Sequence, residues 1–141
     1  MIKLKELIEL KSMVYSEEIK PKHKKKMNRS TPSFHEGIIL PKIQPPDNDS
    51  RITVSELNEL SKIEENDEFA EAMDDVTKTF KPYTEKLGLY EYVEKVLKES
   101  VKYIMELKYH YNRPRPYQVA KFLNIDLNGS TMLDSMKTPS Y

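Results

Sequence analysis

Residues 90–116 read YEYVEKVLKESVKYIMELKYHYNRPRP, and this stretch decides the fold. Apolar side chains recur in it at intervals of three and four, which is the periodicity of one face of an α-helix. They are Val93, Val96, Leu97, Val101, Ile104 and Met105. Pro114 and Pro116 force the residues before them out of helical geometry. The sequence therefore predicts one long helix from Tyr90 to about Asn112, followed by a proline-stiffened turn.

Shorter apolar patterns predict further helices on both sides of this segment. The expected helices span residues 2–15, 54–64, 68–80 and 117–123. Thr53 and Glu56 match a capping box, and Asp67 is a suitable cap for the helix that follows. With three Gly among 141 residues, Gly-rich phosphate loops and tight β-hairpins are disfavoured. The sequence therefore predicts an all-α fold, a helical bundle.

The chain divides at about residue 50. Residues 16–50 contain five prolines and no sustained periodicity, which is typical of an irregular segment. We expect residues 1–50 to form an N-terminal helix followed by a long, basic, irregular arm or linker. Residues 51–141 are then the helical domain.

Charge is segregated along the chain although its total is zero, with 23 basic and 23 acidic residues. Residues 20–29 carry six cationic side chains, so they could contact nucleic acid or another anionic surface. The alternative is a solvated arm. Because no aromatic residue lies within this run, base stacking is not predicted and any such binding should be weak, non-specific and sensitive to salt.

Several kinds of site are disfavoured by composition. The chain has no Cys, and His23, His35 and His110 lack the spacing of a local metal site, so we predict no metal and no cofactor. No stretch of about 18 apolar residues is present and the N-terminus is charged, so neither a membrane span nor a signal peptide is predicted. We expect a soluble chain located in the cytoplasm or, as an alternative, in a virion.

The end of the long helix offers the strongest candidate site. Lys108 lies four residues after Ile104 and seven after Val101, so it continues the apolar face and should point inward. Arg115 follows in the proline-rich turn, and the two side chains could bind an oxyanion as a point charge and a planar fork. Two alternatives stay open. Lysine is favoured in any last helical turn, and Arg-Pro-Arg-Pro can also bind a partner's aromatic groove.

The same residues resemble a known family. Lys108, six intervening residues and then Arg115-Pro116 match the first signature of the type 2 phosphatidic acid phosphatase and vanadium haloperoxidase superfamily, and residues 108–116 read KYHYNRPRP. The resemblance implies an acid-phosphatase-like helical bundle in which Lys108 and Arg115 bind the oxygens of a phosphoryl group. Pro116 supports the signature. It also implies that vanadate can occupy the phosphate site and that the phosphatase branch needs no metal.

The family's later signatures supply its histidines. A Pro-Ser-Gly-His signature and a third one with Arg, His and Asp normally follow, and the later His attacks phosphorus to give a phosphohistidine. The sequence printed here reads Thr138-Pro139-Ser140-Tyr141 at this place. Pro139-Ser140 is therefore either a degraded second signature or a segment just ahead of it. In both cases we expect no catalytic residue within this chain, which would be the N-terminal half of a soluble, bacterial or phage-type phosphatase-like domain.

The sequence therefore predicts two alternative functions. The first is binding of phosphate, vanadate or a small phosphomonoester, with hydrolysis only if a C-terminal half supplies the nucleophile. The second is a non-catalytic helical interaction protein that binds an anionic partner through its basic arm, within a larger assembly such as a viral one. Since half a bundle would leave apolar side chains uncovered, self-association is a further expectation.

Overall fold

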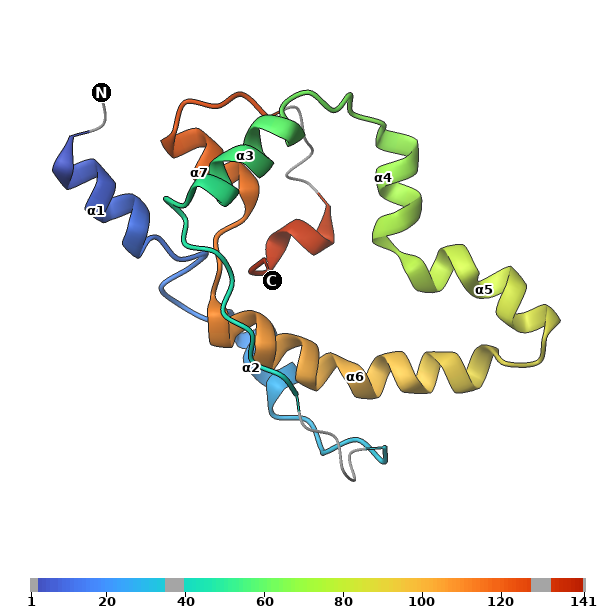
Figure 1. Cartoon of the computed structure of the whole chain (residues 1–141). Helices are drawn as coiled ribbons and strands as arrows, with labels where there is room; N and C mark the ends of the chain where they lie inside the picture. Colours follow the sequence, from blue (N-terminus) through green and yellow to red (C-terminus); the bar gives the residue numbers. More distant parts are fainter. Residues whose placement is uncertain (1–2, 35–39, 128–132, 141) are drawn as a thin grey trace.

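The computed structural model describes residues 3–34, 40–127 and 133–140, and helices supply the regular structure of these residues (Figure 1). Among the described residues, the only β-type pairing is an isolated bridge between Arg113 and Ser140. The helices are α1 Leu4–Ser12, α2 Pro21–Met27, α3 Arg51–Leu60, α4 Asp67–Asp74, α5 Val76–Lys86, α6 Tyr90–Tyr111, α7 Pro116–Phe122 and the short 3-10 helix η1 Asp134–Lys137. The all-α prediction is confirmed.

The long helix predicted from the decisive stretch is α6, of 22 residues. It begins after Gly88, whose φ of 68° lies in the left-handed region that glycine adopts at low cost. It ends at Asn112, which is also left-handed, with φ 47°. None of the described helices, α6 included, is both long and apolar enough to cross a membrane.

A small apolar core joins α1, α3 and α7. Its fully buried members are Leu10, Leu57, Val119 and Ala120. Met13, Phe122, Leu123, Ile125 and Leu127 pack around them. In Figure 1 these three helices lie together at one end of the molecule, away from α4 and α5. The N-terminal helix thus shares a core with helices from residues 51–141.

The first helix and α3 differ in their bounds from the sequence prediction. Helix α1 is shorter than the expected helix over residues 2–15. Asn48 Nδ2 donates to the carbonyl oxygens of Leu10 (3.0 Å) and Met13 (2.9 Å), and these hydrogen bonds cap the C-terminal end of the helix. Helix α3 starts at Arg51 because Ser50, and not Thr53, is its cap: Ser50 Oγ accepts from the Thr53 backbone N–H at 3.1 Å. It ends at Leu60.

The single helix expected over residues 68–80 is two helices. Asn66, not Asp67, caps α4, since Asn66 Oδ1 accepts from the backbone N–H of Phe69 at 2.9 Å. Asp75 interrupts the helix and caps α5 by accepting from the Lys78 N–H at 3.0 Å. Helix α5 then continues through Pro82 to Lys86, beyond the expected end at residue 80. Proline at this position removes one backbone hydrogen bond, and α5 forms despite that loss.

Part of the expected irregular arm is helical. Pro21 occupies the first turn of α2, where its fixed φ suits a helix start. At the other end Lys102 Nζ, from α6, donates to the carbonyl oxygen of Met27 at 2.6 Å. Arg29 Nη1 also reaches the carbonyl oxygen of Lys98 on α6, at 3.3 Å. Helix α2 therefore exists as a short helix held against α6.

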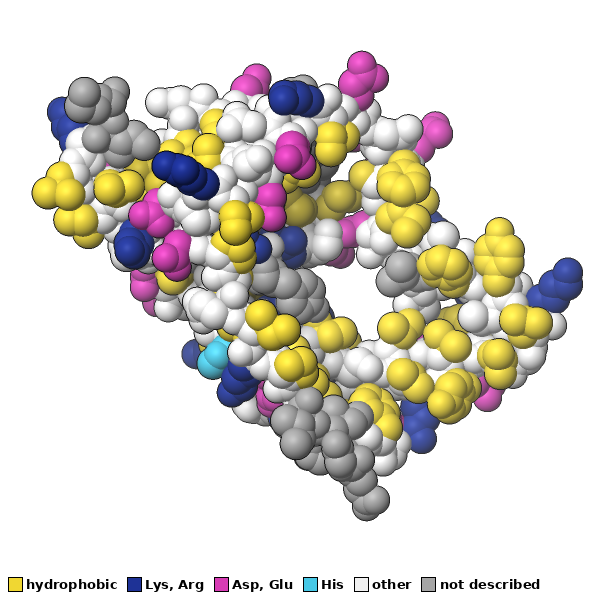
Figure 2. Space-filling view, in the orientation of Figure 1, with side chains coloured by type: hydrophobic (Ala, Val, Ile, Leu, Met, Phe, Trp, Pro, Cys, Tyr) yellow, Lys and Arg dark blue, Asp and Glu magenta, His cyan; other side chains and the backbone are white. Residues whose placement is uncertain are grey.

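Apolar side chains remain exposed on one part of the molecule. Figure 2 shows them gathered over α4, α5 and the neighbouring end of α6. The most exposed include Phe69, Tyr83, Leu87 and Tyr92. Tyr109, Tyr111 and Tyr117, near the other end of α6, are partly buried.

The core makes a direct stability prediction within α3. Leu57 is 2% exposed and belongs to the core, whereas Ile52 on the same helix is 59% exposed. Leu57→Ala should lower the free energy of unfolding by about 2–5 kcal/mol, because it removes buried methyl groups and leaves a cavity. Ile52→Ala should change it by less than about 1 kcal/mol. Urea unfolding followed by circular dichroism measures both, and equal losses would contradict this core.

Candidate oxyanion site

Lys108 is buried in the last turn of α6. Its residue is 9% exposed, in agreement with the inward direction expected from the helical periodicity. Its Nζ donates to Thr138 Oγ1 at 2.8 Å, in a contact that is buried. A charged amine is thus held out of water beside a hydroxyl from a segment 30 residues later in the chain.

Arg115 is held by its backbone and by its side chain. Pro116 begins α7, and the Arg115 backbone N–H donates to Gln118 Oε1 at 2.9 Å, so the residue is fixed as the cap of that helix. Its Nε donates to the Thr138 carbonyl oxygen at 2.7 Å, and Nη2 donates to the Ser135 carbonyl oxygen. With Pro114 buried as well, this turn is not an extended ligand free for a partner's groove.

The two cationic side chains converge on one oxygen atom. Thr138 Oγ1 accepts from Lys108 Nζ at 2.8 Å and from Arg115 Nη2 at 3.3 Å. Burial lowers the pKa of Lys108, and the nearby positive charges of Arg115 and Lys26 lower it further. Like charges in a partly dry site repel, so placing Lys108 and Arg115 together has an electrostatic cost.

The residues that complete this cluster were not found by sequence reasoning. Thr138 was considered as part of a possible signature, whereas Ser135 and Asp74 were not singled out as site residues. Asp74, on α4, accepts from the backbone N–H groups of Asp134 (2.9 Å) and Ser135 (3.1 Å). Its pKa is lowered, first by a hydrogen bond from the Ser135 side chain. These contacts join segments about 60 residues apart, and neither periodicity nor local spacing signals them.

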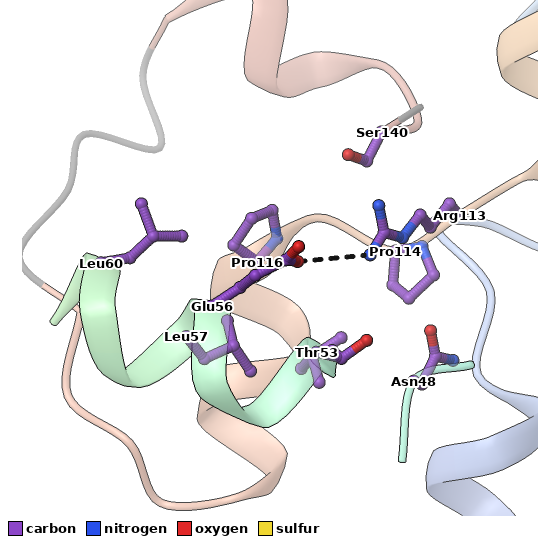
Figure 3. A pocket seen from close by; sticks show the side chains of 10 residues that line it. Asn48, Thr53, Glu56, Leu57, Leu60, Arg113, Pro114, Pro116 and Ser140 are labelled. Carbon is purple, nitrogen blue, oxygen red and sulfur yellow. Dashed lines mark ion pairs between the residues drawn. The ribbon is translucent and has the colours of Figure 1, made fainter. Parts of the chain in front are cut away.

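A small pocket lies beside the same turn (Figure 3). Its volume is about 70 Å³, and an ion pair between Arg113 Nη2 and Glu56 Oε2, at 3.9 Å, lies at its edge. Its lining consists of Asn48, Thr53, Glu56, Leu57, Leu60, Arg113, Pro114, Pro116, Val119 and Ser140. Pockets that hold organic ligands are several times larger, and neither Lys108 nor Arg115 lines this one. We therefore place the candidate site at Thr138 and not in this pocket.

The histidines do not join this cluster in the described part of the chain. His23 is buried, and its Nδ1 lies 2.5 Å from the hydroxyl of Tyr109. His110 is exposed and meets the ring of Tyr111 edge-on, with 4.8 Å between ring centres. His35 lies outside the described residues, and among those described no group of three His, Asp or Glu is arranged to hold a metal ion.

The basic run occupies α2 and its flanks. His23 faces α6, whereas Lys22, Lys24 and Lys25 are exposed on the outside of the helix. Acidic residues are concentrated between Glu64 and Asp75, a segment that includes α4, which has no buried residue. Both charged segments are mostly solvated, apart from the contact of Arg29 with α6 and the contacts that Asp74 makes with residues 134 and 135.

Comparison with known proteins found no relative of this chain. No family model matches the chain, and no curated protein or solved structure matches it. Function is therefore inferred from the contacts of Lys108 and Arg115.

The buried His23 predicts a pH dependence. Burial, and after it the charges of Lys22 and Lys26, lower the pKa of His23 below its ordinary 6.5. The folded state thus favours neutral His23 and the unfolded state binds the proton more readily, so this stability is full above pH 6.5 and is lost as pH falls through the folded pKa. The melting temperature of the wild-type chain minus that of His23→Gln should fall between pH 8 and pH 5. A difference that is constant or grows on acidification would contradict this.

Proposed function

We propose that this chain binds a phosphoryl or vanadate oxyanion through Lys108 and Arg115, as part of a phosphatase-like site. One observation carries the proposal: Lys108 Nζ and Arg115 Nη2 both donate to a single oxygen, Thr138 Oγ1, at 2.8 and 3.3 Å. Two cationic donors directed at one point are the arrangement that phosphoryl oxygens require. The resemblance of residues 108–116 to the phosphatase signature supports the same assignment.

The two side chains play different parts in this proposal. Lys108 is a compact charge at the end of a long helix, and burial keeps water from screening it. Arg115 presents a planar fork whose direction is fixed by Pro116 and by the bond from its own N–H to Gln118. Because the two cationic groups already point at one place, neither has to be reoriented to stabilise negative charge on a phosphoryl group.

Hydrolysis needs further groups in this proposal. An attacking histidine and a proton donor would be supplied by a C-terminal half, as in the family that the signature resembles. Lys108 and Arg115 would hold the non-bridging oxygens while the histidine displaces the leaving group and water then releases phosphate. A small phosphomonoester is the proposed substrate class.

Binding of vanadate tests the proposal directly. Lys108→Ala and Arg115→Ala should each weaken vanadate binding by roughly tenfold or more, because each removes a charge-assisted hydrogen bond. Lys121→Ala removes an exposed lysine of α7 and should leave the affinity unchanged. Isothermal titration calorimetry gives the three dissociation constants, and circular dichroism checks that each variant is folded.

Two results would count against the proposed site. Equal weakening by Lys108→Ala and Lys121→Ala would show general charge attraction, and the absence of vanadate binding in the wild-type chain would remove the site altogether. A matched assay with a generic phosphomonoester, without added metal, should give no hydrolysis by this chain alone. Activity on adding a C-terminal half, inhibited by vanadate and lost in Arg115→Ala, would extend the proposal to catalysis.

A second candidate function rests on α2. We propose that its exposed lysines bind a polyanion, since Lys22, Lys24 and Lys25 point outward while His23 anchors the helix on α6. A rigid helix loses less conformational entropy on binding than an unstructured arm would. Binding of this kind is electrostatic and has no sequence preference.

Salt dependence distinguishes binding through α2 from non-specific charge attraction elsewhere on the chain. For single-stranded DNA, Lys24→Ala with Lys25→Ala should make the slope of log affinity against log salt shallower by about 1.4, since two phosphate contacts are lost. The matched control is Lys62→Ala with Lys78→Ala, which removes two exposed lysines elsewhere. Fluorescence anisotropy between 50 and 200 mM salt would give both slopes, and equal slopes for the two double variants would reject α2 as the binding surface.

A further inference from the structure

The segment from Asp134 to Ser140, here called the strap, covers the candidate oxyanion site. It consists of η1 and the three residues Thr138, Pro139 and Ser140. Thr138 is 5% exposed and Pro139 is below 2%, so the strap is packed into the molecule at this point. In Figure 1 it lies in the space between α6, α7 and α4. The candidate site therefore has an occupant that belongs to the chain itself.

The strap is held at both ends by polar contacts. At its start, the two carboxylate oxygens of Asp74 accept from the N–H groups of Asp134 and Ser135, at 2.9 and 3.1 Å. At its end, the Ser140 N–H donates to the Arg113 carbonyl oxygen at 2.9 Å. Between these points Lys108 and Arg115 bind Thr138. Each anchor is a hydrogen bond that can be exchanged without breaking a covalent bond.

Thr138 Oγ1 occupies the place that suits an oxyanion oxygen. It accepts from Lys108 and Arg115 and donates its own proton to the Ser135 carbonyl oxygen at 3.1 Å. A hydroxyl oxygen carries a partial negative charge, whereas an oxygen of a phosphoryl group carries a share of a full charge. Hydrogen bonds from charged donors are stronger to the latter, so exchange of one oxygen for the other is favourable at these two cations.

We propose that Thr138 is a removable occupant of this site, and that a phosphoryl oxygen replaces Thr138 Oγ1 between Lys108 and Arg115 and loosens the strap. This inference rests on the proposed function, since it concerns how the same site is opened. The closed strap lowers the apparent affinity for the anion by the fraction of molecules in which the site is free. By the same linkage, a bound anion shifts the chain toward the open strap.

Substitutions of Thr138 test the competition. Thr138→Val keeps the shape of the side chain and removes the hydroxyl, so vanadate should bind roughly tenfold more tightly than to the wild-type chain. Thr138→Ser keeps the hydroxyl and should bind as the wild-type chain does. Asp74→Asn weakens the first anchor and should give a smaller increase in affinity. Calorimetry measures all four chains, and circular dichroism checks that each is folded.

Trypsin offers a second test on the wild-type chain. The peptide bond between Lys137 and Thr138 lies within the strap, with Thr138 buried, so cleavage there should be slow when the strap is closed. Inorganic phosphate should speed this cleavage compared with sodium chloride at the same ionic strength. Cleavage after Lys62, an exposed residue outside the strap, is the internal control and should be unchanged. Mass spectrometry of the fragments distinguishes the two sites.

The outcomes separate the strap from the site itself. If Lys108→Ala loses vanadate but Thr138→Val binds it no more tightly than the wild-type chain, the site stands and the strap proposal is overturned. Weaker binding by Thr138→Val would make Thr138 a ligand of the anion and would also overturn it. Vanadate binding by Thr138→Val where the wild-type chain shows none would support it, whereas no binding by either chain would overturn both proposals.

Discussion

The turn that ends α6 is the constraint on which the rest of the structure depends. Asn112 adopts the left-handed conformation, and its carbonyl oxygen accepts from the Tyr15 N–H at 2.8 Å while its Nδ2 donates to the Ser16 carbonyl oxygen at 2.7 Å. The next residue, Arg113, forms the bridge with Ser140. One turn thus ties together the segment after α1, the end of α6 and the strap. It also sets Lys108 and Arg115 on either side of itself, which brings their charged groups to the same point.

The strap offsets part of the electrostatic cost of placing Lys108 and Arg115 close together. Burial and, after it, the nearby positive charge of Arg115 lower the pKa of Lys108. The Thr138 hydroxyl and carbonyl oxygens and the Ser135 carbonyl oxygen accept hydrogen bonds there and offset part of the desolvation. The residues that stabilise the chain in this state are therefore the ones that an oxyanion would displace. In the proposed exchange, stability and anion binding compete for the same donors.

Local signals allowed much of the fold and half of the candidate site to be predicted. The periodicity of α6 and the two prolines after it determine the direction of Lys108 and the rigidity of Arg115, and both follow from nearby residues. Helix α2 could not be predicted this way, because a short lysine-rich helix is stabilised by contacts to α6 that lie far away in sequence. The break at Asp75 was not predicted, because the apolar side chains on both sides of it follow one helical face. Asp75 nevertheless caps a new helix there. Thr138 lies in a segment without periodicity, so its role became visible only when the chain was folded.

The anchoring of the strap also couples α4 to the candidate site. Helix α4 has no buried residue, and Asp74 is the α4 side chain that holds Asp134 and Ser135. The free energy that keeps the strap closed therefore depends on the position of α4. The packing of α4 itself constrains that position only weakly. In the proposed exchange of Thr138 for an anion, binding free energies are reciprocal: a change that moves Asp74 away from the strap would change the anion affinity, and a bound anion would weaken the hold on α4 by the same amount. The exposed apolar side chains of α4 and α5 thus belong to the part of the molecule whose position matters for the proposed site.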